Sequence, residues 1–243
     1  MTNETNLYSD YVRREPHPRA AILIQRWHKK LLKRAVSELL VNPKTVLEIG
    51  PGHGYFAQEC RDLGLQYTYC DTSPAVFTKM TDLGFEGHLG LIHEVTDHLG
   101  QYDLIWMSHV LEHSPTWLDA RNLINTAREL LRPGGSIVVV SPDVLNWRRE
   151  FFNVDWSHGY PTALRNVAQL FSDVGLQEIR GFHHRNGSTS WLQRSVFTLL
   201  SLAPHRIIDR ILTPGRAKIG DGFVYSWKAV FGWRQIMIIG SRD

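Results

Sequence analysis

The chain has 243 residues, of which 43% are hydrophobic and 21% are charged, and its formal net charge is +3. This composition is typical of a globular protein with one domain and an appendage, and the small charge argues against a nucleic-acid partner. The polar first residues lack the apolar core of a secretion signal, and no apolar run is long enough to cross a bilayer. We therefore expect a cytoplasmic protein whose two cysteines, Cys60 and Cys70, are free thiols.

The first 40 residues divide into a polar arm and a helix. Residues 1–16 are polar, whereas Ala20–Leu40 carries apolar side chains at steps of three and four residues, which predicts an amphipathic helix. Asn42-Pro43 ends this helix, because the residue before a proline avoids helical backbone. We therefore treat residues 1–40 as an N-terminal arm and helix.

Strands and helices alternate over residues 41–185. The predicted strands are Thr45–Ile49, Tyr67–Cys70, Tyr102–Met107, Ser136–Val140 and Leu176–Phe182. The predicted helices between them are Tyr55–Leu63, Ser73–Leu83, Thr116–Leu131 and Thr162–Val174, with a loop from Pro142 to Gly159. Such alternation is typical of a doubly wound α/β fold, in which helices cover both faces of a mostly parallel sheet and ligands bind at the carboxyl ends of the strands.

Residues 186–232 interrupt this alternation before a last strand at Gln235–Gly240, within residues 233–243. Apolar residues between Trp191 and Leu212 are flanked by arginines, which predicts a helical insertion. Two roles stay open: a lid or homodimer contact that buries the apolar stripe, or a peripheral membrane contact through residues 191–218. Apolar stripes at helical spacing are usually buried, which favours the first.

Glycines recur at every second position after the first predicted strand, in Glu48-Ile49-Gly50-Pro51-Gly52-His53-Gly54. Glycine leaves room for a ligand to approach bare backbone, and the following helix aims its N-terminal amides at the same point. A dinucleotide fingerprint G-x-G-x-x-G would require a third glycine at Tyr55, so that pattern is absent. The spacing predicts a pocket for another nucleotide-type cofactor.

Two acids accompany these glycines. Asp71 follows the second predicted strand, where a carboxylate can accept two ribose hydroxyl groups; alternatively it caps the helix that begins near Ser73. Glu48 lies on an otherwise apolar strand, and a buried carboxylate is costly unless it is paired. Glu48 therefore either supports the turn or contacts the ligand.

Four motifs in this order resemble those of the class I S-adenosylmethionine (SAM)-dependent methyltransferases. They are the glycine turn, Asp71, the segment Tyr102–His113, and Leu130-Leu131-Arg132-Pro133-Gly134-Gly135. The resemblance is close over Thr45–Pro142 and loose beyond it. It implies a Rossmann-like fold with a seven-stranded sheet, and SAM as the cofactor. It assigns cofactor contacts to Glu48, Gly50, Gly52, Gly54, Asp71, Thr72, Ser108 and His109. The acid that contacts adenine in this family has no clear match in Phe85–Ile92.

Two histidines are candidate bases for an acceptor hydroxyl, because neutral imidazole accepts protons near pH 7. His113 follows the fourth predicted strand, and His158 lies in a loop in which Asp155 could orient it. The alternatives are that His113 caps the next helix or holds a loop carbonyl, and that His158 is a surface turn residue before Gly159. No adjacent pair of acids lies in these loops, so we expect no metal ion.

The loop Asp155–Thr162 resembles a stretch of methyltransferases from polysaccharide and lipopolysaccharide gene clusters. This likeness implies O-methylation of a small polar acceptor, such as a sugar or a lipid-linked glycan. N- or C-methylation of another small molecule is an alternative, as is a methyltransferase-like partner subunit that binds SAM without catalysis. The sequence does not choose among these acceptors.

Overall fold

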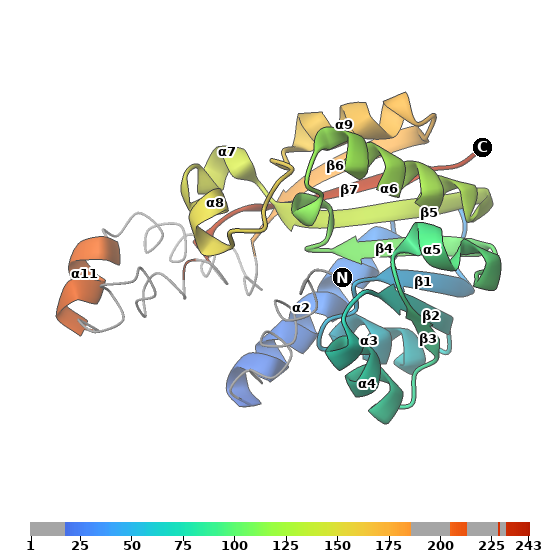
Figure 1. Cartoon of the computed structure of the whole chain (residues 1–243), viewed down its shortest axis with the longest axis horizontal. Coiled ribbons are helices and arrows are strands. Elements are labelled where there is room, and N and C mark those ends of the chain that lie inside the picture. The colour runs from blue at the N-terminus through green and yellow to red at the C-terminus, as the bar shows by residue number, and fades with distance from the viewer. Residues whose placement is uncertain (1–17, 186–204, 213–227, 229–231) are drawn as a thin grey trace.

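The computed structural model describes residues 18–185, 205–212, 228 and 232–243. Seven strands form one sheet in the order β3-β2-β1-β4-β5-β7-β6 (Figure 1). They are β1 (Thr45–Ile49), β2 (Gln66–Asp71), β3 (Gly87–Leu89), β4 (Tyr102–Ser108), β5 (Leu131–Pro142), β6 (Gln177–His184) and β7 (Gln235–Ser241). β7 runs antiparallel to both of its neighbours, whereas the strand pairs from β3 to β5 are parallel. The predicted doubly wound α/β fold is confirmed, as a mixed sheet.

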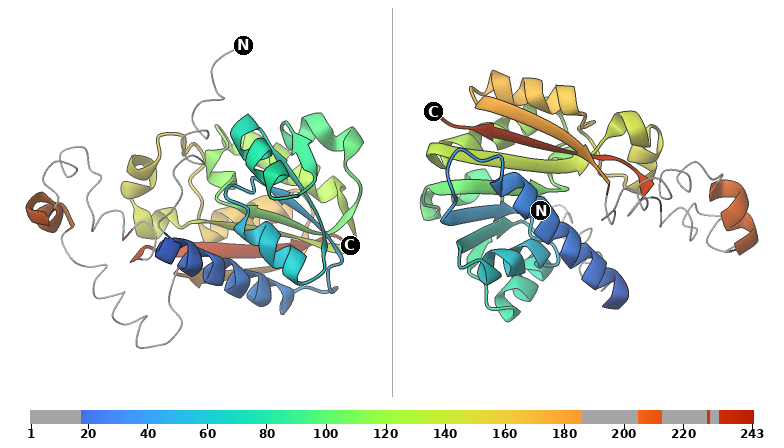
Figure 2. Two further views of the ribbon diagram at one scale, coloured as in Figure 1. Left: turned by 90° about the horizontal axis from the view of Figure 1, so that it is seen from below. Right: turned by 180° about the vertical axis from the view of Figure 1, so that it is seen from behind.

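Helices cover both faces of the sheet (Figures 1 and 2). In chain order, the helices of the described residues are α2 (Pro18–Val36), α3 (Tyr55–Asp62), α4 (Pro74–Asp82), α5 (Ile92–Val95), η2 (Thr96–His98), η3 (Leu111–His113), α6 (Trp117–Glu129), α7 (Val144–Trp147), α8 (Glu150–Val154), α9 (Leu164–Asp173) and α11 (His205–Leu212), and α11 lies away from the sheet (Figure 1). Side chains of α2 and α3 pack on one face of the central strands, and those of α5, α6 and α9 pack on the other. Alternate residues of the buried strands supply both cores, as the period of a strand requires.

The predicted strands and longer helices are present, with differences at their ends, whereas β3, α5 and η2 are not among the predicted elements. α2 ends at Val36 rather than Leu40. β5 begins at Leu131, five residues before the predicted start at Ser136, and its pairing with β4 is irregular between Tyr102 and Leu104. The stretch from Pro142 to Gly159 is not all loop, because it contains α7 and α8. Both helices are too short to show a periodic pattern, which is why the sequence did not reveal them.

Most of the predicted insertion, residues 186–232, lies outside the described residues. Within it the structure describes α11, whose Ile207, Ile211 and Leu212 are exposed. Among the described residues, no helix is both long and apolar enough to cross a membrane. Cys60 and Cys70 are buried free thiols, as expected.

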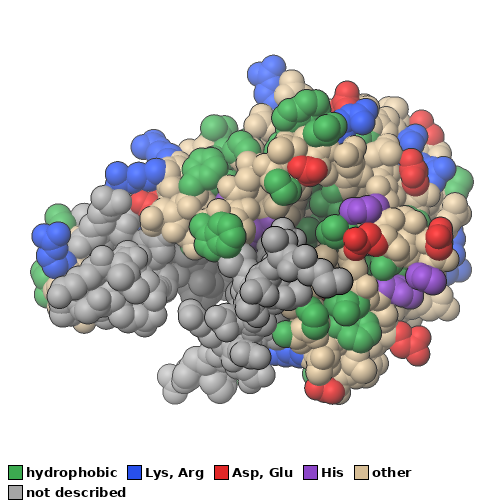
Figure 3. All heavy atoms as spheres, in the orientation of Figure 1, with side chains coloured by type: hydrophobic (Ala, Val, Ile, Leu, Met, Phe, Trp, Pro, Cys, Tyr) green, Lys and Arg blue, Asp and Glu red, His purple; other side chains and the backbone are tan. Residues whose placement is uncertain are grey.

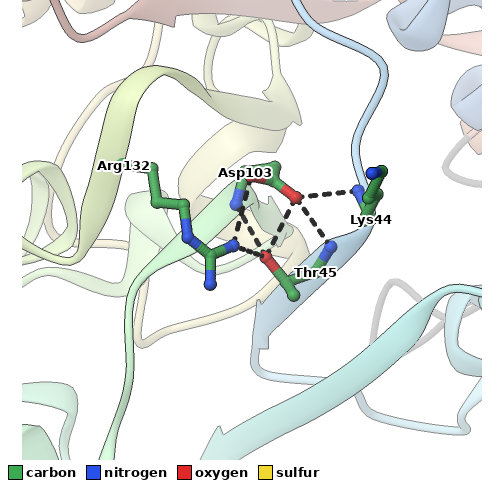
Figure 4. Close-up of polar contacts among 4 residues, drawn as sticks. All are labelled: Lys44, Thr45, Asp103 and Arg132. Atoms are coloured by element: carbon green, nitrogen blue, oxygen red, sulfur yellow. Dashed lines mark hydrogen bonds and ion pairs between the residues drawn. The ribbon is translucent and has the colours of Figure 1, made fainter.

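Asp103 forms polar contacts with Lys44, Thr45 and Arg132 at the amino end of the sheet (Figure 4). Its Oδ2 accepts hydrogen bonds from the backbone N–H groups of Lys44 (2.8 Å) and Thr45 (2.9 Å), and its Oδ1 lies 3.2 Å from Arg132 Nη1. Burial alone would raise the pKa of Asp103, but these partners hold it below its usual value. Asp103 thus joins β1, β4 and β5 at the edge opposite the one where ligands of such sheets bind.

Candidate cofactor and acceptor site

The glycine turn after β1 adopts the backbone that its sequence requires. Gly50, Gly52 and Gly54 have φ angles of 72°, 53° and 76°, in the region that favours glycine. A Cβ atom on Gly50 would lie 2.6 Å from Val110 Cγ2, so a side chain does not fit there without a shift. The turn therefore packs directly against the loop that follows β4.

Strand register brings three of the predicted cofactor residues to one edge. Ile49 pairs with Cys70 on β2 and with Met107 on β4, and Gly50 N–H donates to the Cys70 carbonyl at 3.0 Å. The next residues along the three strands are Gly50, Asp71 and Ser108, which consequently lie side by side at the carboxyl ends. This is the edge where ligands of doubly wound sheets bind.

Asp71 is not the cap of α4. The Ser73 side chain caps that helix by accepting from Val76 N–H, while Asp71 Oδ1 accepts from Ser73 N–H at 2.7 Å. Burial raises the pKa of Asp71 to about 6, although hydrogen bonds from the backbone of Ser73 and Thr72 oppose this rise. Among the described residues, the hydrogen bond from Ser73 N–H to the side chain of Asp71 engages its Oδ1.

Glu48 is 2% exposed, and Tyr67 Oη donates a 2.5 Å hydrogen bond to its Oε2. Burial raises the pKa of Glu48 to about 8; the Tyr67 bond opposes this rise and the nearby charge of Asp71 adds to it. This position of Glu48 is compatible with either role, support of the turn or contact with a ligand. Sequence reasoning missed Tyr67, which gives no signal on a strand where aromatic residues are common.

His109 follows β4 with a φ angle of 58°, which is uncommon outside glycine. Its backbone N–H donates to the Val140 carbonyl at 2.8 Å, and its Nδ1 lies 3.2 Å from Glu112 Oε1. Glu112 is fully buried, and its Oε2 accepts from Ser141 Oγ at 2.8 Å. Burial alone would raise the pKa of Glu112, but His109 and His113 hold it at about 2.

The structure brings His113 and His158 together, with ring centroids 4.9 Å apart. Asp155 does not orient His158 directly: Asp155 Oδ1 accepts from Ser157 Oγ at 2.6 Å, and Ser157 Oγ lies 2.8 Å from His113 Nδ1. His158 Nδ1 instead lies 2.6 Å from the Phe151 carbonyl. The predicted pairing of Asp155 with His158 is therefore replaced by a chain that runs from Asp155 through Ser157 to His113.

The structure excludes one alternative for each histidine. Thr116 is the cap of α6, because its side chain accepts from Asp119 N–H, so His113 is not the cap of that helix. His158 is 9% exposed and is not a surface turn residue. A Cβ atom on Gly159 would lie 2.5 Å from the Ser114 carbonyl oxygen, so this glycine lets the two loops touch.

Counting protons along these hydrogen bonds assigns the tautomers. Ser157 has one hydroxyl proton and donates it to Asp155, so His113 Nδ1 must donate to Ser157 Oγ. A carbonyl oxygen only accepts, so His158 Nδ1 donates to Phe151. Burial lowers the pKa of His113, which favours its neutral form. In the neutral rings both Nε2 atoms consequently carry the lone pair.

A second buried group joins α2, β6 and the loop after β4. Within the described part of the chain, Trp27 Nε1, His28 Nδ1 and both ring nitrogens of His184 are buried without a hydrogen-bond partner. The Trp27 ring lies 6.2 Å from that of His109 and 6.1 Å from that of His184. Burial lowers the pKa of His28 and of His184 to about 3. Sequence reasoning missed this group, because its members come from distant segments.

A family model described as a methyltransferase domain matches residues 22–194, which is most of the chain. No curated protein matched the sequence. The matched range includes the glycine turn, Glu48, Asp71, His113 and His158.

Solved structures share the fold at low identity. A SAM-dependent methyltransferase from Archaeoglobus fulgidus is 18% identical, with a TM-score of 0.62 over 90% of this chain and 94% of that one. The N-methyltransferase NodS from Bradyrhizobium japonicum, in complex with S-adenosylhomocysteine, is 16% identical, with a TM-score of 0.63 over the whole of both chains. The structure is also similar to one of the Trm112 activator with a methyltransferase from Haloferax volcanii, at 14% identity and a TM-score of 0.64 over 98% of each chain.

These matches agree with the architecture of the sheet and the backbone of the glycine turn. The chain therefore belongs to the methyltransferase-domain family and is a class I SAM-dependent methyltransferase, with SAM as its cofactor.

Proposed function

We propose that this methyltransferase methylates a hydroxyl group of a small polar acceptor, with a saccharide or glycolipid intermediate as the first candidate. The observation that carries this proposal is the pair His113 and His158, whose rings are held by hydrogen bonds at the edge beside the glycine turn. Bound SAM supplies a methyl carbon on a positively charged sulfur. Transfer to oxygen breaks the carbon–sulfur bond, forms a carbon–oxygen bond and releases the proton of the hydroxyl.

We propose that the cofactor lies along the carboxyl edge of β1, β2 and β4. The backbone of Gly50, Gly52 and Gly54 would approach its amino-acid end, and Asp71 would accept the ribose hydroxyls. Thr72, Ser108 and His109 would line the same edge. Glu48 would act from beneath the turn, either by supporting it or by responding to the positive charge of the ligand.

On the acceptor side, the histidine pair takes up the released proton. Both Nε2 atoms carry a lone pair in the neutral rings, which a base requires. The Asp155–Ser157 chain fixes the ring of His113, and the Phe151 carbonyl fixes that of His158. A nitrogen acceptor would need no such base, so the pair favours oxygen over nitrogen as the methylated atom.

Apolar side chains gather on α7, α8 and the loop that follows them (Figure 3). Leu145, Phe152 and Trp156 are 71%, 52% and 79% exposed. Exposed apolar patches often mark binding sites, and Trp156 stands two residues before His158. An indole ring offers a flat face for the apolar side of a sugar ring, which supports a saccharide acceptor.

The test combines binding with transfer. Isothermal titration should show that SAM binds and that NAD does not, and labelled SAM should methylate members of a panel of sugar nucleotides and lipid-linked glycans. Amines and carbon acids belong in the same panel, because methylation of those alone would replace the proposal by N- or C-methylation. SAM binding without transfer to any acceptor would instead favour a non-catalytic partner subunit.

The roles of the histidines are tested separately from cofactor binding. His113→Ala and His158→Ala should each lower the rate of methyl transfer while leaving the affinity for SAM nearly unchanged. If both variants keep full turnover, proton removal by these histidines is wrong. Trp156→Ala should raise the KM of a saccharide acceptor and leave kcat nearly unchanged, as expected for a residue that only binds.

For residues 186–232 we propose a lid or homodimer contact rather than a membrane contact. The exposed Ile207, Ile211 and Leu212 of α11 support an apolar contact of some kind. Measuring the molar mass in solution, together with flotation on anionic vesicles, distinguishes these roles. Flotation of the wild type that Ile211→Ser abolishes would overturn the preference for a lid or dimer.

A further inference from the structure

Three side chains with metal-binding atoms converge beside the cofactor edge. Glu112 and His113 belong to η3, and His158 belongs to the loop after α8. One ligand atom from each lies within 4.8 Å of the other two. Ligand atoms of one zinc ion lie about 3.4 Å apart, given bond lengths of about 2.1 Å at tetrahedral angles. Small rotations of these side chains would therefore bring all three atoms around a common ion.

The surroundings of the two imidazoles match those of metal-bound histidines. A histidine ligand usually donates its second ring N–H to a carbonyl, a carboxylate or a water, which fixes the tautomer and turns the other nitrogen toward the metal. His158 donates from Nδ1 to the Phe151 carbonyl, and His113 donates from Nδ1 to Ser157, which in turn donates to Asp155. The Nε2 atoms are thus the ones presented as ligands.

The carboxylate of Glu112 adds an independent observation. Its side chain is fully buried, and its Oε1 has no hydrogen-bond partner in the part of the chain that the structure describes. His109 Nδ1 lies 3.2 Å from this oxygen, within ion-pair distance, and Ser141 Oγ donates a hydrogen bond to the other oxygen. A buried carboxylate oxygen without a hydrogen bond is costly, and a cation in the cluster would satisfy it.

We propose that Glu112, His113 and His158 bind one divalent transition-metal ion, of the class that includes Zn²⁺, Mn²⁺ and Fe²⁺. Two imidazoles with one carboxylate suit these ions, whereas Mg²⁺ and Ca²⁺ prefer oxygen ligands throughout. The sequence predicts no metal because it contains no adjacent pair of acids in these loops. A site of mixed ligands needs no such pair, and here the fold assembles it from two loops.

Three protein ligands leave coordination positions open, as in catalytic zinc sites. An acceptor hydroxyl bound at an open position would lose its proton more readily, since a metal ion lowers the pKa of a bound oxygen. This role toward the acceptor rests on the proposed function, but the binding of the ion does not. Proton removal through a bound ion and proton removal by an imidazole without a metal are alternatives for this step, and the metal content of the active protein distinguishes them.

The experiment measures metal binding by the full chain after treatment with a chelator and dialysis. Co²⁺ is titrated by visible absorption, and Zn²⁺ is then used to displace it. We expect one equivalent of Co²⁺, with affinity reduced at least tenfold in His158→Ala and in Glu112→Gln. Ser157→Ala, which removes only the partner of a ligand, should weaken binding about tenfold. His113→Asn provides a further ligand variant if either of the first two does not fold.

The matched control is His98→Ala. His88 on β3 and His98 on η2 form another imidazole pair, with ring centroids 5.9 Å apart, and neither belongs to the proposed ligand set. This variant should bind Co²⁺ like the wild type. Absence of a stoichiometric site, or equal affinity in the wild type and His158→Ala, would overturn the proposal.

Titration of SAM into the same preparations keeps the two proposals distinguishable. SAM binding without any metal site rejects the ion and leaves the histidine pair as bases. A metal site in a protein that methylates no acceptor supports the ion and rejects only the proposed function.

Discussion

The proposed cofactor half and the proposed acceptor half of the site differ in how the pKa values of their acids are shifted. On the cofactor side, burial raises the pKa of Glu48 to about 8 and that of Asp71 to about 6. On the acceptor side, His109 and His113 hold the pKa of Glu112 at about 2 in spite of its burial, and Ser157 with both histidines keeps that of Asp155 below its usual value. The acids of the acceptor half thus have hydrogen-bonding partners and histidines of this chain beside them. Within the described residues, the causes of the Glu48 and Asp71 pKa shifts include no cation, which suits a ligand that is itself positively charged.

The halves also differ in which atoms do the binding. The cofactor half presents backbone at positive φ and relies on strand register, so its essential feature is the absence of side chains at Gly50 and Gly54. The acceptor half relies on side chains from two loops that meet only in the folded chain. Adding a side chain to the glycine turn should therefore reduce ligand binding sharply, whereas removing one side chain from the acceptor half should reduce its function only in part.

The largest effect should follow Gly50→Ala. The new Cβ would lie 2.6 Å from Val110 Cγ2 at a φ angle of 72°, so we expect the affinity for SAM to fall at least a hundredfold and stability to fall by about 1–3 kcal/mol. Gly64→Ala is the control, because its φ angle is 70° but nothing lies within 4 Å of the added atom. Gly64→Ala should lower the stability of the protein but leave its affinity for SAM unchanged. Equal SAM affinities of the two variants would contradict the role of the turn.

Asp71→Ala should weaken SAM binding by about 1–3 kcal/mol, the contribution of a hydrogen bond to a charged group. Asp71→Asn retains an oxygen that can accept from Ser73 N–H and so separates loss of charge from loss of the local turn. Isothermal titration measures both variants. Unchanged affinity in Asp71→Ala would remove the ribose role.

Glu48 should make the stability of the unliganded protein depend on pH. Its folded pKa of about 8 exceeds the ordinary value of 4.5, so the folded state binds more protons than the unfolded state between these pH values. Stability should be highest below pH 4.5 as far as this group is concerned, and should fall by a few kcal/mol as the pH rises through about 8. Denaturation of the wild type and Glu48→Gln between pH 5 and about 9 checks this. An equal decline in both would assign the effect to other groups.

The smallest effect should follow Ser157→Ala, which breaks the chain from Asp155 to His113 without removing either histidine. If the acceptor half acts on the proton, kcat should fall about tenfold while SAM affinity stays the same. Ser172→Ala, at an exposed position on α9, is the control. A loss of SAM affinity in Ser157→Ala would mean that the two halves are not separate.

The sequence predicted most of the fold because its signals are local. Apolar runs followed by turn residues gave the strands, and three- and four-residue spacing gave the longer helices. The short helices α7 and α8 were not predicted, because they have too few residues to show the periodic spacing of apolar side chains that marks a helix. The alternating glycines marked the cofactor turn for the same reason: one continuous segment contains the whole signal.

The sequence by itself determined the doubly wound sheet, the positive-φ turn at Gly50 and the acid at Asp71, since each depends on neighbours along the chain. Tertiary structure alone decided that Asp155 serves His113 through Ser157, and that Glu112 joins His113 and His158. Those contacts join segments that only folding brings together. A hydrogen bond requires its two atoms to be placed within a few tenths of an ångström, and the spacing of residues along the sequence does not specify that.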